Sequence, residues 1–243
     1  MPRLLLISNS TVHGRGYLDH VEGEIRDFVG NRTRLMFVPY ALHDRRAYCA
    51  QAESRLTRLG FEFTSAHDVS NALRAIEQSE VIFIGGGNTF RLLHELQKNC
   101  LIEPIRRAVR NDALYIGSSA GSIVACPSLK TTKDMPVVQP MSFEALALVP
   151  FQISPHYLDP DPNSSHMGET QEQRILQFLE ENEEPVVGLR EGSFLRVEHE
   201  AVMLKGPHSA RIFRRGAAPV EVSSGNNLND LLVRQLSSAG LVA

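Results

Sequence analysis

Cysteine is scarce in this chain of 243 residues, and its three positions are Cys49, Cys100 and Cys126. They are odd in number and far apart. This spacing excludes a disulfide framework and the paired spacing typical of a zinc site. We therefore expect buried free thiols and no bound metal.

The chain also lacks an excess of charge of either sign. It has 25 basic and 28 acidic side chains, a formal net charge of -3. Such a balance provides no electrostatic footprint for nucleic acid or for an anionic membrane surface. A small molecule or a peptide is the expected partner, and the charge balance does not determine whether the chain forms a homodimer.

Long hydrophobic runs are absent as well. The first ten residues contain one basic residue and a short apolar run, unlike a signal peptide. No stretch approaches the roughly 18 apolar residues of a membrane span. The expected location is the cytoplasm. Hydrophobic residues make up 42% of the chain and charged residues 22%, which is ordinary for a globular protein.

Strands and helices alternate through the first half of the chain. An apolar run at residues 4–8 reads as a buried strand. Apolar residues at helical spacing follow at 18–29, and a second strand is expected at 34–38. Together these segments form a βαβ unit, which predicts an α/β fold.

The clearest central strand is expected at residues 81–84. A glycine-rich turn follows it, then helices at 89–96 and 104–110 and a strand at 114–116. Alternation of this kind predicts a mainly parallel sheet covered by helices on both faces.

Regular alternation weakens beyond Ala125, where prolines follow one another closely and predict loops. A helix is expected at 170–179, and the short strands after it read as an antiparallel C-terminal extension. No repeat, low-complexity tract or linker marks a boundary, so residues 1–243 are expected to form a single domain.

Ser119 is the candidate nucleophile. It stands at the centre of Gly117-Ser118-Ser119-Ala120-Gly121, between the strand at 114–116 and an apolar run at 123–125. This G-x-S-x-G pattern is typical of a strained strand-to-helix turn that exposes a serine hydroxyl. Small residues can also form such a turn for packing reasons alone.

A serine hydroxyl needs a general base, and the base needs an orienting group. His156 follows a short apolar run that would bring it to the same rim as Ser119, and His166 is its nearest rival. A surface histidine on a proline-rich loop is the alternative interpretation of His156.

Two carboxylates are candidates for the orienting acid. Asp134 produces the chain order Ser, Asp, His found in α/β-hydrolases, although the spacing is more compressed. Glu191 follows an apolar strand and precedes Gly192. Either residue could instead be an ordinary loop carboxylate.

Acyl transfer also needs donors for the developing oxyanion. Ala120 follows the nucleophile and supplies one N–H by position. Gly87 lies in Gly85-Gly86-Gly87-Asn88, between a strand and a helix, and could supply the second. A glycine turn at a helix N-terminus can also bind phosphate. Neither G-x-G-x-x-G nor G-x-x-x-x-G-K-[ST] is present, so no nucleotide cofactor is expected.

Several separated motifs together resemble the peptidase E family of serine peptidases, the α-aspartyl dipeptidases, which is related to cyanophycinase. The similarity runs from the first strand to about Gly206. The motifs are Gly117 to Gly121, Val81 to Phe90, Thr131 to Pro136, Ser154-Pro155-His156, and Gly168-Glu169-Thr170 with Gln173-Arg174.

The resemblance implies a flavodoxin-like or class I glutamine amidotransferase-like fold and cleavage of dipeptides with an N-terminal aspartate, with no metal. It assigns the nucleophile to Ser119, the base to His156, the acid to Asp134 with Glu191 as alternative, and the oxyanion hole to Gly87 and Ala120.

Binding an aspartate side chain requires a cation or several donors. Arg174 and Asn88 are the candidate substrate-binding residues. Gln171 departs from the pattern, because the family's bacterial members are expected to carry a basic residue there, and Ser118 replaces a bulky aromatic. Activity on β-aspartyl or cyanophycin-like linkages, and a non-catalytic ligand-binding relative, are the alternative functions.

Overall fold

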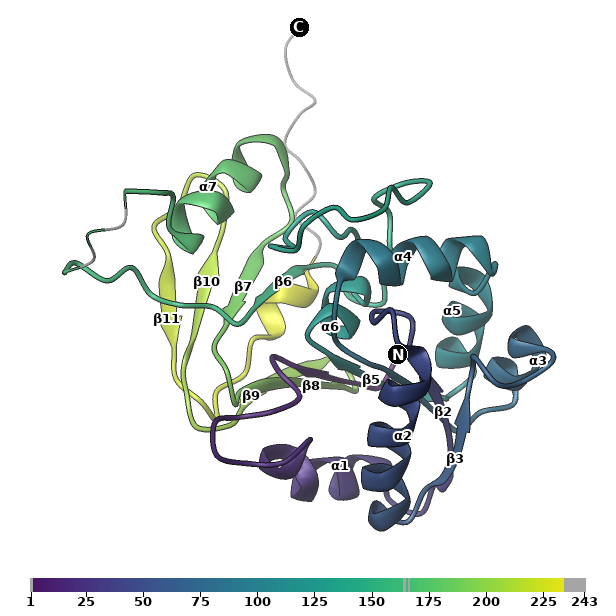
Figure 1. Cartoon of the computed structure of the whole chain (residues 1–243). Coiled ribbons are helices and arrows are strands. Elements are labelled where there is room, and N and C mark those ends of the chain that lie inside the picture. The colour runs from purple at the N-terminus through teal and green to yellow at the C-terminus, as the bar shows by residue number, and fades with distance from the viewer. Residues whose placement is uncertain (1, 164, 166, 234–243) are drawn as a thin grey trace, which may run out of the picture.

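The backbone forms two β-sheets with helices packed around them (Figure 1). The structure, a computed structural model, describes residues 2–163, 165 and 167–233. The larger sheet has seven strands in the order β3 (Glu62–Ser65), β2 (Arg34–Val38), β4 (Val81–Ile84), β5 (Leu114–Ser118), β1 (Leu4–Ile7), β8 (Phe194–Glu198) and β9 (Ala201–Lys205). The smaller sheet has four, in the order β11 (Val220–Val222), β10 (Ala210–Phe213), β7 (Val186–Leu189) and β6 (Gln152–Pro155).

The first five strands of the larger sheet are parallel, which confirms the predicted α/β fold. The C-terminal strands differ from the expected single antiparallel extension. Strands β8 and β9 extend the larger sheet, whereas β7 pairs in parallel with β6, and β10 and β11 complete the smaller sheet. Both β6 and β7 are buried at every residue, as strands covered on two faces are.

Helices cover both faces of the larger sheet. On one face α1 (Glu22–Val29) and α2 (Arg45–Leu56) pack against Leu5 and Ile7 of β1. On the other face α4 (Thr89–Lys98) and α5 (Ile102–Arg110) belong to the cluster that contains Leu4 and Leu6. Successive side chains of a strand point to opposite faces, which is why one apolar run supplies both clusters.

The remaining helices are short or lie near the smaller sheet. They are η1 (Asp19–Val21), η2 (Thr57–Leu59), α3 (Ala72–Glu77), α6 (Ala120–Val124), α7 (Gln171–Glu181) and η3 (Asn229–Leu232). No helix in the described part of the chain is long and apolar enough to cross a membrane.

The two sheets share a hydrophobic core. Ile153 of β6 and Val187 of β7 belong to the same cluster as Ile82 of β4. On the far side of the smaller sheet, Ile175 and Leu179 of α7 pack in a separate cluster. The shared core holds the ends of strands from both sheets close together, and the candidate site lies at these ends.

Helix α7 begins with a capping box. The Thr170 hydroxyl accepts a hydrogen bond from the Gln173 N–H (3.2 Å), and Gln173 Oε1 accepts one from the Thr170 N–H (2.8 Å). This cap defines where the helix starts, and it therefore places Gln171 and Arg174 on the first turn of α7.

Candidate active site

Ser119 occupies a strained turn between β5 and α6. Its φ of 52° and ψ of -109° lie in a region that residues other than glycine rarely adopt. The Ser119 N–H donates to the Ile7 carbonyl at 2.9 Å, and the N–H groups of Ser122 and Ile123 donate to the Ser119 carbonyl. Because the main chain of the turn is held in this way, the Ser119 side chain is left free to act.

The glycines of the turn are required by close packing. A Cβ on Gly117 would lie 2.6 Å from the Gly121 carbonyl oxygen, and a Cβ on Gly121 would overlap the Ile84 carbonyl oxygen. The G-x-S-x-G spacing therefore allows the turn to pack against β4. Ser118 is fully buried, and its hydroxyl has no hydrogen-bond partner among the described residues.

His156 connects the serine to a carboxylate. Its Nε2 lies 2.9 Å from Ser119 Oγ, and its Nδ1 lies 2.6 Å from Glu191 Oε1. When Nδ1–H donates to the carboxylate, Nε2 is free to accept the serine proton. The His156 and Glu191 side chains are 39% and 53% exposed, so the site is open to solvent.

Asp134, the first choice for the acid, lies elsewhere. Its Oδ2 accepts hydrogen bonds from the Thr89 N–H and hydroxyl, both at 2.7 Å, and from the Thr132 hydroxyl at 3.1 Å. Within the described residues it makes no hydrogen bond to His156. Asp134 belongs to a segment that packs against the start of α4, whereas His156 and Glu191 follow the paired strands β6 and β7. The geometry thus favours the alternative acid, Glu191.

The glycine loop after β4 lies beside the nucleophile. A Cβ on Gly86 would be 3.2 Å from Ser119 Cβ, and Gly87 has a φ of 134°, which favours glycine. Among the described residues, the N–H groups of Gly87 and Ala120 have no hydrogen-bond acceptor. Both expected oxyanion donors are therefore free to bind a ligand.

Further residues contact the main chain of His156. Its N–H donates to the Ser8 hydroxyl (2.9 Å), and its carbonyl accepts from Lys133 Nζ (3.0 Å) and Gln171 Nε2 (3.2 Å). Sequence reasoning did not single out Ser8 or Lys133. The available signals were a polar residue directly after a buried strand and a lysine inside the Thr131 to Pro136 motif.

The two candidate substrate-binding residues differ in whether their side chains already form close hydrogen bonds within the protein. Asn88 uses its side chain as the N-cap of α4, accepting from the Arg91 N–H at 3.0 Å, and donates to the Met135 carbonyl at 2.8 Å. Arg174 is 55% exposed, and its Nε lies 3.6 Å from Glu169. The polar atoms of the Asn88 side chain therefore bond to the main chain around α4, whereas the Arg174 guanidinium is available to a ligand.

Lys133, Gln171 and Arg174 line one small pocket beside the base. Desolvation lowers the pKa of Lys133 to about 8, an effect that the nearby Asp134 and Glu191 carboxylates oppose. The pocket lining thus includes three basic side chains, Lys130, Lys133 and Arg174, and the neutral amide of Gln171.

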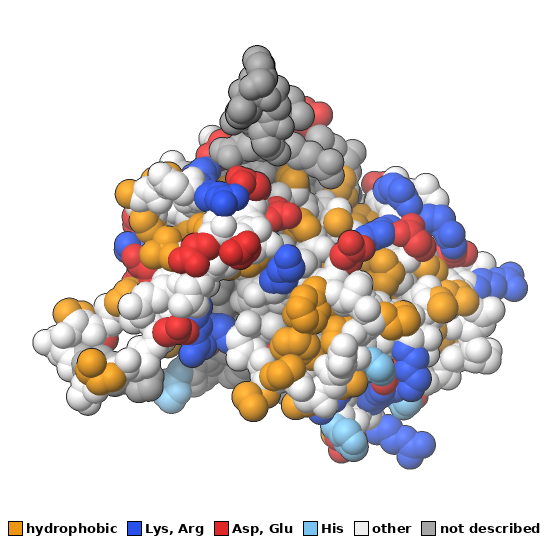
Figure 2. Space-filling view, turned by 90° about the horizontal axis from the view of Figure 1, so that it is seen from above, with side chains coloured by type: hydrophobic (Ala, Val, Ile, Leu, Met, Phe, Trp, Pro, Cys, Tyr) orange, Lys and Arg blue, Asp and Glu red, His pale blue; other side chains and the backbone are white. Residues whose placement is uncertain are grey.

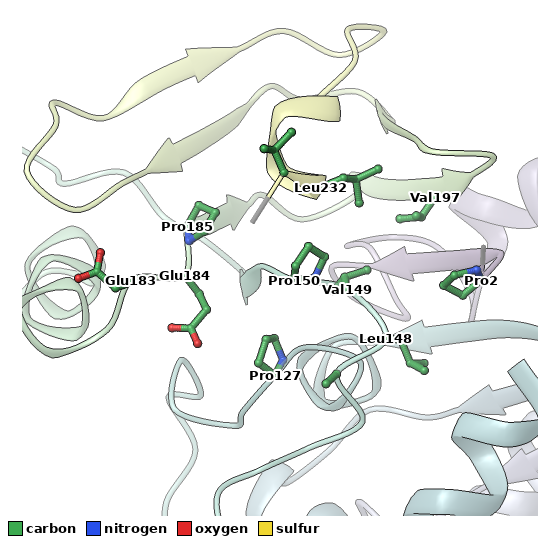
Figure 3. Close-up of a pocket in the computed structure, with 12 residues that line it drawn as sticks. Pro2, Pro127, Leu148, Val149, Pro150, Glu183, Glu184, Pro185, Val197 and Leu232 are labelled. Atoms are coloured by element: carbon green, nitrogen blue, oxygen red, sulfur yellow. The ribbon is translucent and has the colours of Figure 1, made fainter. Parts of the chain in front are cut away.

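A larger cavity of about 580 Å³ lies away from this site (Figure 3). Its lining includes Pro2, Pro150 and Pro185, which precede β1, β6 and β7. Ser119, His156 and Glu191 are not part of the lining. In parallel sheets ligands bind at the carboxyl ends of strands, so the opposite end is a poor candidate for the reaction.

Hydrophobic side chains are also exposed on the face seen from above (Figure 2). The segment between α6 and β6 runs over α4 and is held there by hydrogen bonds from His94 and Gln97 (Figure 1). Its exposed apolar side chains are Met135, Val137, Met141 and Phe143.

The cysteines do not compete with Ser119 for the role of nucleophile. Cys126 is fully buried, and burial raises the pKa of its thiol. Cys49 is buried too, but Cys100 is exposed just after α4, so the prediction of buried thiols is wrong for Cys100.

Within the described residues, no group of three or more His, Cys, Asp or Glu side chains could hold a metal ion. His166 lies outside the described residues.

The chain is similar to several known proteins. Peptidase E of Streptomyces coelicolor is 52% identical over 229 residues, covering 94% of each chain. A probable alpha-aspartyl dipeptidase of Drosophila melanogaster is 44% identical, covering 94% of this chain and 97% of its own. A peptidase structure from an acI-B1 actinobacterium has a TM-score of 0.68 at 14% identity, covering 94% of this chain and 96% of its own, and shows the shared fold.

The family model described as peptidase family S51 matches residues 4–205. The match spans most of the chain and includes Ser119, His156 and Glu191. It confirms the resemblance found from the separated motifs, and the protein is a serine peptidase. The chain belongs to peptidase family S51.

Proposed function

We propose that this peptidase hydrolyses dipeptides whose first residue is aspartate, through an acyl-enzyme on Ser119. The observation that carries the proposal is the hydrogen-bonded series Ser119, His156 and Glu191 beside two free N–H donors. The names of the relatives, peptidase E and alpha-aspartyl dipeptidase, support the substrate class.

In the first half of the reaction His156 Nε2 accepts the Ser119 hydroxyl proton while Oγ attacks the carbonyl carbon of the Asp-X bond. The Glu191 carboxylate stabilises the resulting imidazolium, and the N–H groups of Gly87 and Ala120 stabilise the oxyanion. The C–N bond then breaks, and His156 donates its proton to the leaving amine.

In the second half water replaces the leaving amine. His156 accepts a proton from the water, whose oxygen attacks the acyl carbon. The bond between this carbon and Ser119 Oγ breaks, His156 returns the proton to Oγ, and aspartate is released. No cofactor takes part in either half.

Selection of aspartate is assigned to the cations of the small pocket. Arg174 is exposed and only loosely paired with Glu169, and Lys133 lies next to the main chain of the base. Either cation can pair with a substrate carboxylate, which a neutral glutamine at position 171 cannot do. Asn88 contributes indirectly, because its side chain caps the N-terminus of α4.

The setting of the enzyme is part of the same proposal. Free thiols at Cys49, Cys100 and Cys126 support a reducing compartment, the cytoplasm.

The exposed apolar side chains over α4, which are Met135, Val137, Met141 and Phe143, support a homodimer. Sedimentation velocity at several concentrations would test this. The net charge of -3 gives no support to a nucleic-acid partner.

A dipeptide panel tests the substrate class. Purified protein is incubated with Asp-Leu, Asn-Leu, Glu-Leu and β-Asp-Leu, and released amino acids are quantified. Asp-Leu should be cleaved fastest, and Ser119→Ala should lower its turnover by about 10⁴-fold or more. Equal turnover by Ser119→Ala and wild type would refute the assignment of Ser119 as the nucleophile. Faster cleavage of β-Asp-Leu than of Asp-Leu would favour activity on β-aspartyl linkages. No cleavage and no labelling of Ser119 by a serine-directed probe would indicate a non-catalytic relative.

A further inference from the structure

The proposed triad spans two sheets. Ser119 follows β5 of the larger sheet, whereas His156 and Glu191 follow β6 and β7 of the smaller one. In the part of the chain that the structure describes, no strand of one sheet pairs with a strand of the other. Something other than strand pairing must therefore hold the base and the acid in position relative to the nucleophile.

Strand β1 lies where such a connection can be made. It is the neighbour of β5, and Ile7 is paired with Ser118, so the chain leaving β1 emerges beside the nucleophile. The next two residues are polar yet buried: Ser8 is 0% exposed and Asn9 is 2% exposed. Buried polar side chains are retained where their hydrogen bonds are satisfied.

Three consecutive residues each hold one segment of the triad. The Ile7 carbonyl accepts from the Ser119 N–H (2.9 Å), and the Ser8 hydroxyl accepts from the His156 N–H (2.9 Å). Asn9 Oδ1 accepts from the N–H of Gly192, the residue after Glu191, at 2.7 Å. One short segment is thus bonded to all three.

The side chains of Ser8 and Asn9 each make two hydrogen bonds, one as donor and one as acceptor. The Ser8 hydroxyl donates to the Leu189 carbonyl at 2.9 Å, so it bridges the ends of β6 and β7. Asn9 Nδ2 donates to the Thr11 carbonyl at 2.8 Å, which orients its oxygen toward Gly192. The main chain of His156 has a φ of 51°, a conformation that persists only where its surroundings enforce it.

We infer that Ser8 and Asn9 are positioning residues that hold the His156 base and the Glu191 acid in line with Ser119. The inference rests on the proposed function for its kinetic readout only. Neither side chain touches the reacting atoms. Removing the Ser8 hydroxyl leaves the His156 N–H without its partner and takes from the Leu189 carbonyl one of its two donors, the other being the Tyr157 N–H. Removing the Asn9 amide leaves the Gly192 N–H without its partner.

The test uses Ser8→Ala, Asn9→Ala and the conservative Ser8→Thr in the full chain. Ser65→Ala is the matched control: Ser65 is a buried serine at the last position of β3, and its hydroxyl bonds to the His67 N–H and Cys49 rather than to the triad. Thermal unfolding of every variant separates lost positioning from lost folding.

Kinetics with Asp-Leu give the first readout. Ser8→Ala and Asn9→Ala should each lower kcat by about 10- to 100-fold, with KM within about 2-fold, because a misplaced base slows the chemical step. Ser8→Thr keeps the hydroxyl and should restore most of kcat. Ser65→Ala should lower the unfolding temperature similarly without changing kcat. Equal kcat in Ser8→Ala, Asn9→Ala and wild type would overturn the inference.

Proton NMR gives a second readout that needs no substrate. The Nδ1 proton between His156 and Glu191 should give a far-downfield resonance, identified by its loss in Glu191→Gln. It should weaken or move upfield in Ser8→Ala and Asn9→Ala and persist in Ser8→Thr and Ser65→Ala. A resonance unchanged in both alanine variants would refute the positioning role, whereas failure to cleave Asp-Leu with the resonance changed as expected would refute only the proposed function.

Discussion

Glu191 Oε1 lies 2.6 Å from His156 Nδ1, and the two residues leave neighbouring parallel strands side by side. Pro155 of β6 is paired with Leu189 of β7, so His156 follows its strand directly and Glu191 comes two residues after the other strand ends. The carboxylate therefore meets the imidazole through the register of the smaller sheet, and the Asp134 segment takes no part in this contact.

Replacing each candidate acid distinguishes their roles. Glu191→Gln should lower kcat by about 10³- to 10⁴-fold, because the imidazole loses the carboxylate that selects its tautomer and stabilises its charged form. Asp134→Asn should keep more than about a tenth of kcat and destabilise the protein by about 1 kcal/mol, since it weakens the bonds to Thr89 and Thr132. Steady-state kinetics and urea unfolding measure both effects. A kcat as low in Asp134→Asn as in Glu191→Gln would contradict this assignment.

Gly86→Ala tests the packing of the glycine loop on the nucleophile. The added methyl would lie 3.2 Å from both the Ser118 carbonyl oxygen and Ser119 Cβ, closer than ordinary contact. Displacement of Ser119 should lower kcat by about 10- to 100-fold. Gly23→Ala is the control, because a methyl there meets no atom within 4 Å, and it should leave kcat unchanged. Unchanged activity in Gly86→Ala would mean that the loop yields without moving the serine.

Aspartate selection should depend on pH through Lys133. Its pKa of about 8 means that the side chain is positively charged below that pH and becomes neutral above it. Attraction for the substrate carboxylate is present at the lower pH and is lost as the pH rises through about 8. The ratio of kcat/KM for Asp-Leu to that for Asn-Leu should fall over this range. The substrate α-amino groups titrate in the same pH range, so the effect is assigned to Lys133 by comparing variants.

Variants assign the pH effect to one residue. In Lys133→Met the ratio should be lower at neutral pH and should no longer fall near pH 8. In Arg174→Ala the ratio should drop by about 10-fold or more, because a charge-assisted hydrogen bond is lost, but its pH dependence should remain. A ratio that falls with pH in Lys133→Met as in wild type would exclude Lys133 as the titrating group.

Thiol labelling tests the burial of the cysteines. In the folded protein a thiol reagent should modify Cys100 alone, because Cys49 and Cys126 are buried and burial raises the pKa of both thiols. All three should react after denaturation. Mass spectrometry of the labelled peptides measures both states, and rapid labelling of Cys126 in the native protein would be incompatible with the described core.

The sequence predicted those features that depend on neighbouring residues. Strand Val81–Ile84 is a run of four buried apolar residues, and the turn at Ser119 is recognisable from its flanking glycines. The acid was harder to assign, because it depends on which strands pair in space. The hydrogen bonds of Ser8 and Asn9 to the triad segments join residues 148 and 183 positions apart. No local pattern reports such contacts, and a polar residue after a strand is compatible with many roles.

The division of the proposed triad between two sheets has a consequence for how the enzyme loses activity. If loosening of the shared core let one sheet rotate slightly against the other, the strand pairing of each would be kept, and a shift of about 1 Å at a reacting atom is enough to cost about 10²-fold in rate. Turnover therefore reports on the docking of the two sheets within one chain, a more sensitive property than their secondary structure. Mild denaturant should abolish turnover at concentrations where the far-UV circular dichroism spectrum is still that of the native protein.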